Sequence, residues 1–408
     1  MQKTQYLIIG AGHAGVVAAM AARARDPDGT ILMIGEEDTL PYERPGLSKS
    51  VLAGDKSPDA LQICDHEKLA QLGIKTILGI TVDDVSAKSC RVRLNDGTVW
   101  QYQKLLFATG SRVRPLPVPG ADLKGVHYLR TKSDAIALRD TLMHTTNLIV
   151  VGAGFVGLEV AATAREAFGC NVTVVEAGPE VLQRAAPERL RGALREMHEA
   201  RGVTFVLKTG VAGFVNDEDH VAGVSLDDGQ TIKADAVVIG IGALPNVEIA
   251  RQAGLDTADG ILTDAFGKTS DENIWAAGEV ARHVFGACGA LVRHESWQMA
   301  QMQAALVGAN MAGAADEISY VPWFWTDQYG VNYQLLGRTG PDLNVAVRTY
   351  EAPTSSTVIY LDGDAVVGAL CINAGKDIAP IRKAITAGLS GKIARLSDAS
   401  INLKSAFH

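Results

Sequence analysis

One glycine pattern, GxGxxG, occurs twice in this chain, at residues 10–15 and again at residues 152–157. Each copy directly follows a short apolar strand and opens an alanine-rich segment of helical character. An acidic residue then follows by about 20 residues, Glu36 in the first copy and Glu176 in the second. Strand, glycine turn, helix and acid together form the pattern that binds a dinucleotide.

The residue types explain this chemistry. Glycines let the backbone approach a pyrophosphate, whose charge is stabilised by amide N–H groups at the helix N-terminus. The acid accepts hydrogen bonds from a ribose diol. Two glycine-rich turns in an unrelated α/β protein are the alternative interpretation, because a lone GxGxxG run is weak evidence. Two complete copies favour two dinucleotides, a nicotinamide and a flavin, arranged as an electron relay.

Size and composition limit the other possibilities. A chain of 408 residues is expected to hold two or three domains, and 42 glycines with 47% hydrophobic residues indicate an α/β protein. A net charge of −8 gives no reason to expect nucleic-acid binding. No apolar run approaches the ~18 residues of a membrane span. The chain enters the strand at residues 6–9 almost at once, without a signal peptide, so we expect a cytoplasmic protein.

The cysteines are scattered and odd in number, and no two form a CxxC pair. A disulfide framework, a zinc site and an iron–sulfur cluster held by this chain are therefore not expected. Most of the five cysteines are expected to be buried small hydrophobic residues; the five are Cys64, Cys90, Cys170, Cys288 and Cys371.

The stretches after the two glycine runs resemble each other. Each contains an Asp-Gly hairpin between alternating strands, at residues 91–102 and 223–233. Each hairpin is followed by an apolar strand that ends in small residues, at 105–110 and 236–242. This pattern indicates an internal duplication with a small meander in each copy.

The character of the chain changes after residue 242. A strand-to-helix turn is expected at 274–280 and a long helical stretch at 295–304. A third unit is expected from about Ser319, with a hairpin at 357–370 and a helix near 378–387.

The order of the motifs is similar, essentially end to end, to that of a known family. The two most discriminating segments are PYERPGLSK at 41–49 and PWFWTDQ at 322–328. The chain resembles the FAD-dependent NADH:ferredoxin reductases of bacterial Rieske dioxygenase and P450 systems, in the glutathione-reductase structural class. Further matching segments are residues 10–15, 34–37, 108–110, 129–131, 152–159, 176, 240–242, 277–279 and 295–297.

The resemblance implies an α/β fold with two Rossmann-like nucleotide-binding domains and a C-terminal α+β cap or interface domain. The FAD-binding domain would be discontinuous, at 1–113 and 243–317. The NAD-binding domain would span 114–242 and the cap 318–408.

The resemblance also implies the binding residues. Those for FAD are Gly10, Gly12, Ala14, Gly15, Glu36, Arg44, Lys49, Val82, Ala108, Thr109, Gly110, Arg130, Glu279, Glu295, Trp297 and Trp325. Those for NADH are Gly152, Gly154, Val156, Gly157, Glu159, Glu176, Arg184, Gly240, Ile241 and Gly242.

Two catalytic residues follow from the same resemblance. The family places Lys49 beside flavin N5, where a cation favours an anionic reduced flavin. Glu159 matches the acid that pairs with this lysine; the alternative is that Glu159 faces solvent on its helix.

Several other positions leave alternatives open. Glu37 competes with Glu36 for the adenosine ribose, and Arg44, Arg130 and Arg184 are otherwise solvated arginines.

Three positions depart from the family pattern. Glu279 stands where the family usually has Asp, Gly46 where it usually has a second proline, and His294 where an aliphatic residue is common. The tryptophans of this region are expected near the flavin ring or its cap, or else in a core: Trp297, Trp323 and Trp325.

The remaining inferences concern the reaction. Glu176 predicts NADH over NADPH, because a carboxylate repels a 2′-phosphate. Residues 41–63 contain no cysteine, so the redox-cysteine routes of disulfide reductases and of NADH oxidases and peroxidases lack their nucleophile.

The expected acceptor is a [2Fe-2S] ferredoxin, indirectly serving a terminal Rieske-type aromatic-ring oxygenase. The alternatives are an apoptosis-inducing-factor-like flavoprotein or a P450 redoxin or rubredoxin reductase. A basic docking surface is expected, with Arg293, His294 and Arg44 as possible members.

Overall fold

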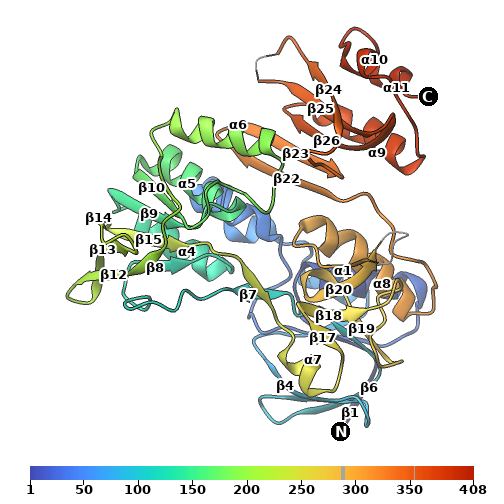
Figure 1. Cartoon of the computed structure of the whole chain (residues 1–408). Helices are drawn as coiled ribbons and strands as arrows, with labels where there is room; N and C mark the ends of the chain where they lie inside the picture. The colour runs from blue at the N-terminus through green and yellow to red at the C-terminus, as the bar shows by residue number, and fades with distance from the viewer. Residues whose placement is uncertain (286–289, 353) are drawn as a thin grey trace. The chain divides into compact units, whose positions relative to one another are not determined.

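The computed structural model describes residues 1–285, 290–352 and 354–408, which form two compact units (Figure 1). The first unit consists of Met1–Arg44, Pro58–Arg112 and Ala243–Tyr320. The second consists of Pro45–Ser57, Val113–Gly242 and Val321–His408. The PYERPGLSK segment is thus divided between the units, and the C-terminal region belongs to the same unit as the second glycine turn.

The first unit is built on a seven-stranded sheet whose central strands are parallel. Apolar runs such as Leu7 and Ile8 are fully buried, as expected for a parallel sheet covered on both faces. The strand order is β3 (Ile74–Ile77), β2 (Ile31–Ile34), β1 (Gln2–Ile9), β6 (Val99–Phe107), β5 (Arg91–Leu94) and β4 (Val82–Ser86), and β19 (Ile274–Ala276) also pairs with β6.

Two helices of the first unit, α1 (His13–Arg25) and α8 (Ala304–Met311), lie side by side (Figure 1). Their close approach depends on Gly308, where a Cβ atom would lie 2.3 Å from the carbonyl oxygen of Ala18. The helical stretch expected at 295–304 begins later, at Trp297, and passes through a π-helix, Met299–Gln303, before α8. The helix propensities of individual residues do not predict a π-helical turn, because its extra residue depends on how the helix packs in the fold.

Smaller elements complete the first unit. They are η2 (Pro58–Leu61), α3 (His66–Gln71), α7 (Glu248–Gln252), η3 (Gly278–Val280), the strands β17 (Thr257–Ala258), β18 (Gly260–Thr263), β20 (Ala281–Phe285) and β21 (Ala290–Val292), and β16 (Ala243–Pro245), which pairs with β7 (Ser111–Val113). The turn η1 (Arg44–Gly46) lies where the chain leaves this unit.

The second unit contains a five-stranded parallel sheet and a separate three-stranded meander. The sheet order is β11 (Thr204–Leu207), β10 (Asn171–Glu176), β9 (Asn147–Val151), β15 (Ala236–Ile239) and β8 (Val126–Tyr128). The meander is β12 (Val211–Asp217), β13 (His220–Leu226) and β14 (Thr231–Lys233). The helices are α2 (Ser50–Ala53), α4 (Lys132–Leu142), α5 (Phe155–Phe168) and α6 (Glu188–Glu199).

Both expected Asp-Gly hairpins are confirmed, but the two copies differ in how the meander joins the main sheet. In the first copy the two expected strands are one continuous strand, β6. In the second copy β14 and β15 belong to different sheets, because the chain turns at Asp235. The Asp235 carboxylate accepts hydrogen bonds from the amides of Thr146 and Asn147, at 3.0 and 2.7 Å.

The C-terminal region of the second unit is an antiparallel sheet with helices on one face. Its order is β22 (Trp323–Gln328), β23 (Val331–Gly337), β26 (Ala365–Ile372), β25 (Ser356–Asp362) and β24 (Asn344–Thr349), followed by η5 (Gly375–Asp377), α9 (Ile378–Thr386), α10 (Ile393–Ser397) and α11 (Leu403–Ala406). The expected hairpin and helix are confirmed as β25–β26 and α9. Side chains on the other face, such as Tyr333 and Leu370, share a core with Leu158 of α5.

The cysteines in the described ranges are free, and three of them are buried: Cys64, Cys170 and Cys371. Cys288 lies outside the described residues. No helix in the described ranges is long and apolar enough to cross a membrane.

Candidate functional site

The two glycine turns have the same geometry, and their first glycines explain why. Gly10 and Gly152 adopt positive φ angles of 114° and 102°, which favour glycine. A Cβ atom on Gly10 would lie 2.2 Å from the carbonyl oxygen of Ala108, and one on Gly152 would lie 2.5 Å from that of Gly240. The turns therefore pack against the strand ends of β6 and β15.

The third glycines allow each helix to approach its own turn. A Cβ atom on Gly15 would lie 1.9 Å from the carbonyl oxygen of Gly10, and the corresponding distance between Gly157 and Gly152 is 2.2 Å. Both positions require glycine for the packing of the protein itself.

The second glycines differ, and they test whether a ligand fits. A Cβ atom on Gly12 would meet no atom within 4 Å, and one on Gly154 would meet only the Gly240 oxygen at 3.9 Å. Both residues have negative φ angles, and each is the N-cap residue of its helix. Protein packing does not require glycine here, whereas a pyrophosphate against the amides of the first helical turn does. The two turns therefore fit two dinucleotides.

The two acidic residues are not structurally equivalent. Ile34 lies opposite Ile9 in the first sheet, as Val175 lies opposite Val151 in the second. Glu176, the last residue of β10, therefore corresponds to the residue before Glu36.

That preceding residue, Gly35, is constrained by packing. A Cβ atom on Gly35 would lie 2.5 Å from the Cβ of Ala11 in the glycine turn. This contact leaves no room for an acid at the strand end of the first copy, and Glu36 follows one position later.

Glu176 contacts the glycine turn directly. Its Oε2 accepts a hydrogen bond from the Ala153 amide at 2.8 Å, and its Oε1 accepts one from the Gly178 amide at 2.7 Å. The half-buried carboxylate is thereby held beside the second turn. This is the position from which a ribose hydroxyl would be bound.

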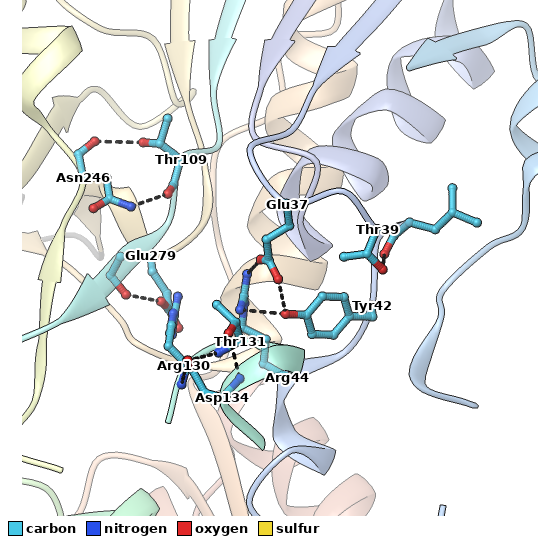
Figure 2. Close-up of polar contacts among 12 residues, drawn as sticks. Glu37, Thr39, Tyr42, Arg44, Thr109, Arg130, Thr131, Asp134, Asn246 and Glu279 are labelled. Carbon is cyan, nitrogen blue, oxygen red and sulfur yellow. Dashed lines mark hydrogen bonds and ion pairs between the residues drawn. The ribbon is translucent and has the colours of Figure 1, made fainter. Parts of the chain in front are cut away.

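In the first copy, Glu37 is engaged within its own segment (Figure 2). Its Oε1 forms an ion pair with Arg44 Nη2, and its Oε2 accepts a hydrogen bond from the Tyr42 hydroxyl, both at 2.6 Å. The Arg44 guanidinium lies over the Tyr42 ring. Glu36 is exposed, so the ribose role stays with Glu36 as a prediction.

The turn after β6 is held by a residue that the sequence did not indicate. Asn246 Nδ2 donates to the Thr109 carbonyl at 2.8 Å, and the Thr109 hydroxyl donates to the Asn246 carbonyl at 2.9 Å (Figure 2). The backbone N–H of Asn246 also donates to the Gly110 carbonyl. An asparagine far along the chain carries no motif, so only the fold brings it to residues 109–110.

Glu279, the departure from the family's Asp, accepts a hydrogen bond from the Ser111 hydroxyl at 2.7 Å. It lies in η3, directly after β19. The longer side chain thus has a partner within the first unit, and its contact with FAD remains a prediction.

Trp297 is fixed by two contacts in the first unit. Its indole Nε1 donates to Glu43 Oε1 at 3.1 Å, and its ring lies edge-on to that of His13 at 5.2 Å. Glu295 is exposed and pairs with Arg293 at 2.7 Å. Val82 is the first residue of β4 and its side chain is buried in the core, so only its backbone is available to a ligand.

Two of the possible docking residues, Arg293 and His294, are not free cations, and the basic docking surface itself stays a prediction. The Arg293 side chain is only 9% exposed and is paired with both Asp259 and Glu295. Burial lowers the pKa of His294 below its usual value, so its ring is neutral at pH 7. The Asp259 partner is distant in sequence and burial depends on the fold, so the basic residue types alone did not reveal this environment.

The second unit brings Lys49 and Glu159 together at 2.7 Å. Both side chains are shielded, with exposed fractions of 19% and 6%, so the solvent-facing alternative for Glu159 is wrong. The Ser48 hydroxyl donates to Glu159 Oε2 at 2.5 Å, and the Thr326 hydroxyl donates to Oε1 at 2.6 Å. The two discriminating segments of the sequence, PYERPGLSK and PWFWTDQ, therefore both contact this carboxylate.

The remaining expected residues lie in several places. The amides of Arg130 and Thr131 donate to Asp134 in a capping box that begins α4 (Figure 2). Trp323 and Trp325 are stacked at 4.9 Å. Val156, beside the second glycine turn, is unusually exposed at 45%, and Arg184 is also exposed. Ile241 and Gly242 follow β15, next to Gly240.

Cys64, the cysteine that follows residues 41–63 in the chain, does not have the properties of a reactive thiol. Cys64 is buried, and burial together with Asp65 raises the pKa of its thiol, which disfavours the reactive thiolate. The described residues contain no His, Cys, Asp and Glu cluster that could hold a metal ion. The fold and the two turns define an oxidoreductase class that binds two dinucleotides.

Comparison with known proteins specifies this class. The pyridine nucleotide-disulphide oxidoreductase family matches residues 4–304, and the reductase C-terminal family matches residues 323–407. The chain belongs to the pyridine nucleotide-disulphide oxidoreductase family, and it is an oxidoreductase that uses FAD and a nicotinamide nucleotide. The expected α/β class, with two nucleotide-binding regions and a C-terminal domain, is confirmed.

The chain is similar over its whole length to ferredoxin reductases. It is 43% identical to the ferredoxin–NAD(+) reductase component of the anthranilate 1,2-dioxygenase system of Burkholderia cepacia, covering 99% of both chains. The ferredoxin reductase for the CYP199A2 system of Rhodopseudomonas palustris matches with a TM-score of 0.94 and 35% identity. The match covers 99% of this chain and 100% of that chain. Putidaredoxin reductase, in its covalent complex with putidaredoxin, matches with a TM-score of 0.93 and 33% identity. The match covers 100% of this chain and 98% of that chain.

Proposed function

We propose that this protein is an NADH:ferredoxin oxidoreductase that serves a Rieske-type aromatic-ring oxygenase from the cytoplasm. The observation that carries the proposal is the pair of glycine turns, each with open space beside its second glycine and a helix N-terminus behind it. Because residues 41–63 contain no redox cysteine to accept the electrons, they would pass to an external acceptor. The relatives named for ferredoxin reduction support the choice of acceptor.

The two turns are assigned to different nucleotides. Residues 1–113 and 243–317 would bind FAD through Gly12 and Glu36, and residues 114–242 would bind NADH through Gly154 and Glu176. Residues 318–408 would form the cap. Bound FAD accepts electrons as a pair and releases them singly, which connects NADH to a one-electron carrier.

Lys49 and Glu159 would be the catalytic pair. The carboxylate holds the Lys49 ammonium in one place, and the Pro45 carbonyl accepts a second hydrogen bond from it at 3.1 Å. A fixed cation in a shielded site stabilises developing negative charge more strongly than a mobile one in water.

Ferredoxin dependence tests the function. The purified holoenzyme is expected to reduce cytochrome c with NADH at least tenfold faster when a [2Fe-2S] ferredoxin is added, because the ferredoxin is the intended one-electron carrier. Several ferredoxins of Rieske and P450 systems are compared, with a rubredoxin as the alternative carrier. Rates that ignore every carrier would favour the apoptosis-inducing-factor-like alternative, and a response to rubredoxin alone would favour a rubredoxin reductase.

Nucleotide preference tests the role of Glu176. We expect kcat/KM for NADH to exceed that for NADPH by roughly 100-fold, because like charges brought together cost several kcal/mol. Glu176→Gln removes the negative charge but retains an acceptor for one backbone amide, so this ratio should fall at least fivefold. The same ratio is measured for Arg184→Gln, which changes the exposed arginine predicted to bind NADH. An unchanged ratio in Glu176→Gln, or a wild-type preference for NADPH, contradicts the assignment.

A further inference from the structure

A chain of hydrogen bonds leads from helix α6 to the carboxylate of Glu159. The Tyr329 hydroxyl lies 3.2 Å from His198 Nδ1, and His198 Nε2 lies 2.7 Å from Gln328 Oε1. Gln328 Nε2 donates to Thr326 Oγ1 at 3.1 Å, and Thr326 Oγ1 donates to Glu159 Oε1 at 2.6 Å. The chain lies entirely within the second unit.

The interior members of this chain are shielded from water. His198 and Thr326 are completely buried, and Gln328 is 2% exposed. Buried polar groups are costly unless they are hydrogen-bonded, and each of these side chains has a partner on both sides. These side chains therefore depend on one another, and not on solvent, for their hydrogen bonds.

The direction of donation is determined at every link. An ionised carboxylate only accepts, so the Thr326 hydroxyl must donate its proton to Glu159. Thr326 then accepts from the Gln328 amide nitrogen, which turns the amide oxygen toward His198. Burial, despite an opposing hydrogen bond to Gln328, lowers the pKa of His198 to about 4, so the ring is neutral at pH 7. Its Nε2–H donates to Gln328, and its Nδ1 accepts from Tyr329.

The chain ends on the oxygen that also binds the lysine. Lys49 Nζ and Thr326 Oγ1 both contact Oε1 of Glu159, at 2.7 and 2.6 Å, whereas Ser48 contacts Oε2. Loss of the Thr326 hydroxyl would leave only Ser48 and Lys49 to hold the carboxylate, so it could rotate about its last bond more easily and the ammonium would move with it.

We propose that Thr326 is a positioning residue for the Lys49–Glu159 pair, and that Gln328 and His198 orient the Thr326 hydroxyl toward Glu159. The proposal rests on the proposed function, because it concerns how the catalytic pair of that function is held. Thr326 would act through Glu159 and would not itself touch a nucleotide. Such a residue affects the rate of the reaction more than the affinity for NADH.

The test is the rate at which NADH reduces the bound flavin, followed at 450 nm in anaerobic stopped flow. Thr326→Val is similar in size but lacks the hydroxyl, and it should slow this rate about tenfold, because small misplacements of catalytic groups cost up to ~100-fold. Thr326→Ser retains the donor and should stay within twofold of wild type. The apparent Kd for NADH should change less than threefold in both variants.

A matched control separates positioning from stability. Thr357 is also fully buried in an antiparallel strand, and its hydroxyl donates to Asp377 at 2.7 Å. Thr357→Val should lose comparable thermal stability but keep the wild-type rate. Thr326→Ala provides a second hydroxyl-free side chain if the valine variant does not fold. Gln328→Met, which removes the donor to Thr326, should slow flavin reduction about threefold.

The outcomes distinguish this inference from the proposed function. A wild-type flavin that NADH does not reduce would refute the function itself. A normal wild-type rate with hydroxyl-free variants equally fast would overturn the role of Thr326. Slow reduction in Thr326→Ser would also overturn it, because the effect would then come from packing. An unchanged rate in Gln328→Met would overturn the orienting role of Gln328.

Discussion

Gly12→Val is expected to give a folded protein without FAD. Gly12 has a φ of −89° and a ψ of −166°, an extended conformation that valine adopts readily. A Cβ atom there meets no protein atom within 4 Å, so the free protein should tolerate the change. The added methyl groups would instead occupy the space where the pyrophosphate approaches the first turn of α1. Absorbance at 450 nm and the flavin-to-protein ratio measure the loss.

Gly154→Val is the matched experiment on the second turn. This residue is also extended, and its Cβ would meet only one atom, at 3.9 Å. We expect full FAD content, because the first turn is unaltered, but a Kd for NADH raised at least 100-fold. Dithionite should still reduce the flavin.

Gly192→Val is the control, since Gly192 also has open space around it but lies on α6 and belongs to neither glycine turn. It should retain both nucleotides. FAD bound at wild-type stoichiometry by Gly12→Val, or unaltered NADH affinity in Gly154→Val, would show that these turns do not bind the pyrophosphates.

Lys49→Met is expected to slow flavin reduction by NADH roughly 100-fold, because a preorganised charged group of this kind contributes about that factor. The change removes the cation but retains an unbranched side chain. Glu159 would keep the Ser48 and Thr326 hydroxyls as donors yet lose its counter-charge. Breaking a shielded ion pair by removing one partner destabilises the fold by about 3 kcal/mol. Rates and urea unfolding should therefore be measured on the same FAD-loaded samples.

Lys124→Met is the matched control for the lysine. Lys124 pairs with Asp219 in the same unit, but both side chains are more than half exposed. Its loss should leave the rate and the stability almost unchanged, because exposed ion pairs contribute little. Flavin reduction within threefold of wild type in Lys49→Met would refute the catalytic role of the lysine.

Local patterns accounted for much of the fold. The Asp-Gly hairpins, the hairpin β25–β26 and helix α9 were predictable because turn chemistry and periodicity act over a few residues. The continuity of β6 and the π-helix at Met299–Gln303 were not, since both depend on neighbours distant in sequence. The offset between Glu36 and Glu176 was missed for the same reason: it becomes visible only in the strand register beside Ala11 and Ala153.

By itself, the sequence determined that this protein has two glycine turns for two dinucleotides, and that no cysteine in residues 41–63 can carry electrons between them. Both properties are local, because a GxGxxG turn and its helix are specified by adjacent residues. Only the tertiary structure decided what holds Glu159. Its carboxylate collects Lys49, Ser48 and Thr326 from two segments far apart in the chain. No sequence pattern links a serine or threonine to an acceptor so far away in the chain, since a hydroxyl becomes a positioning group only when folding buries it against that acceptor.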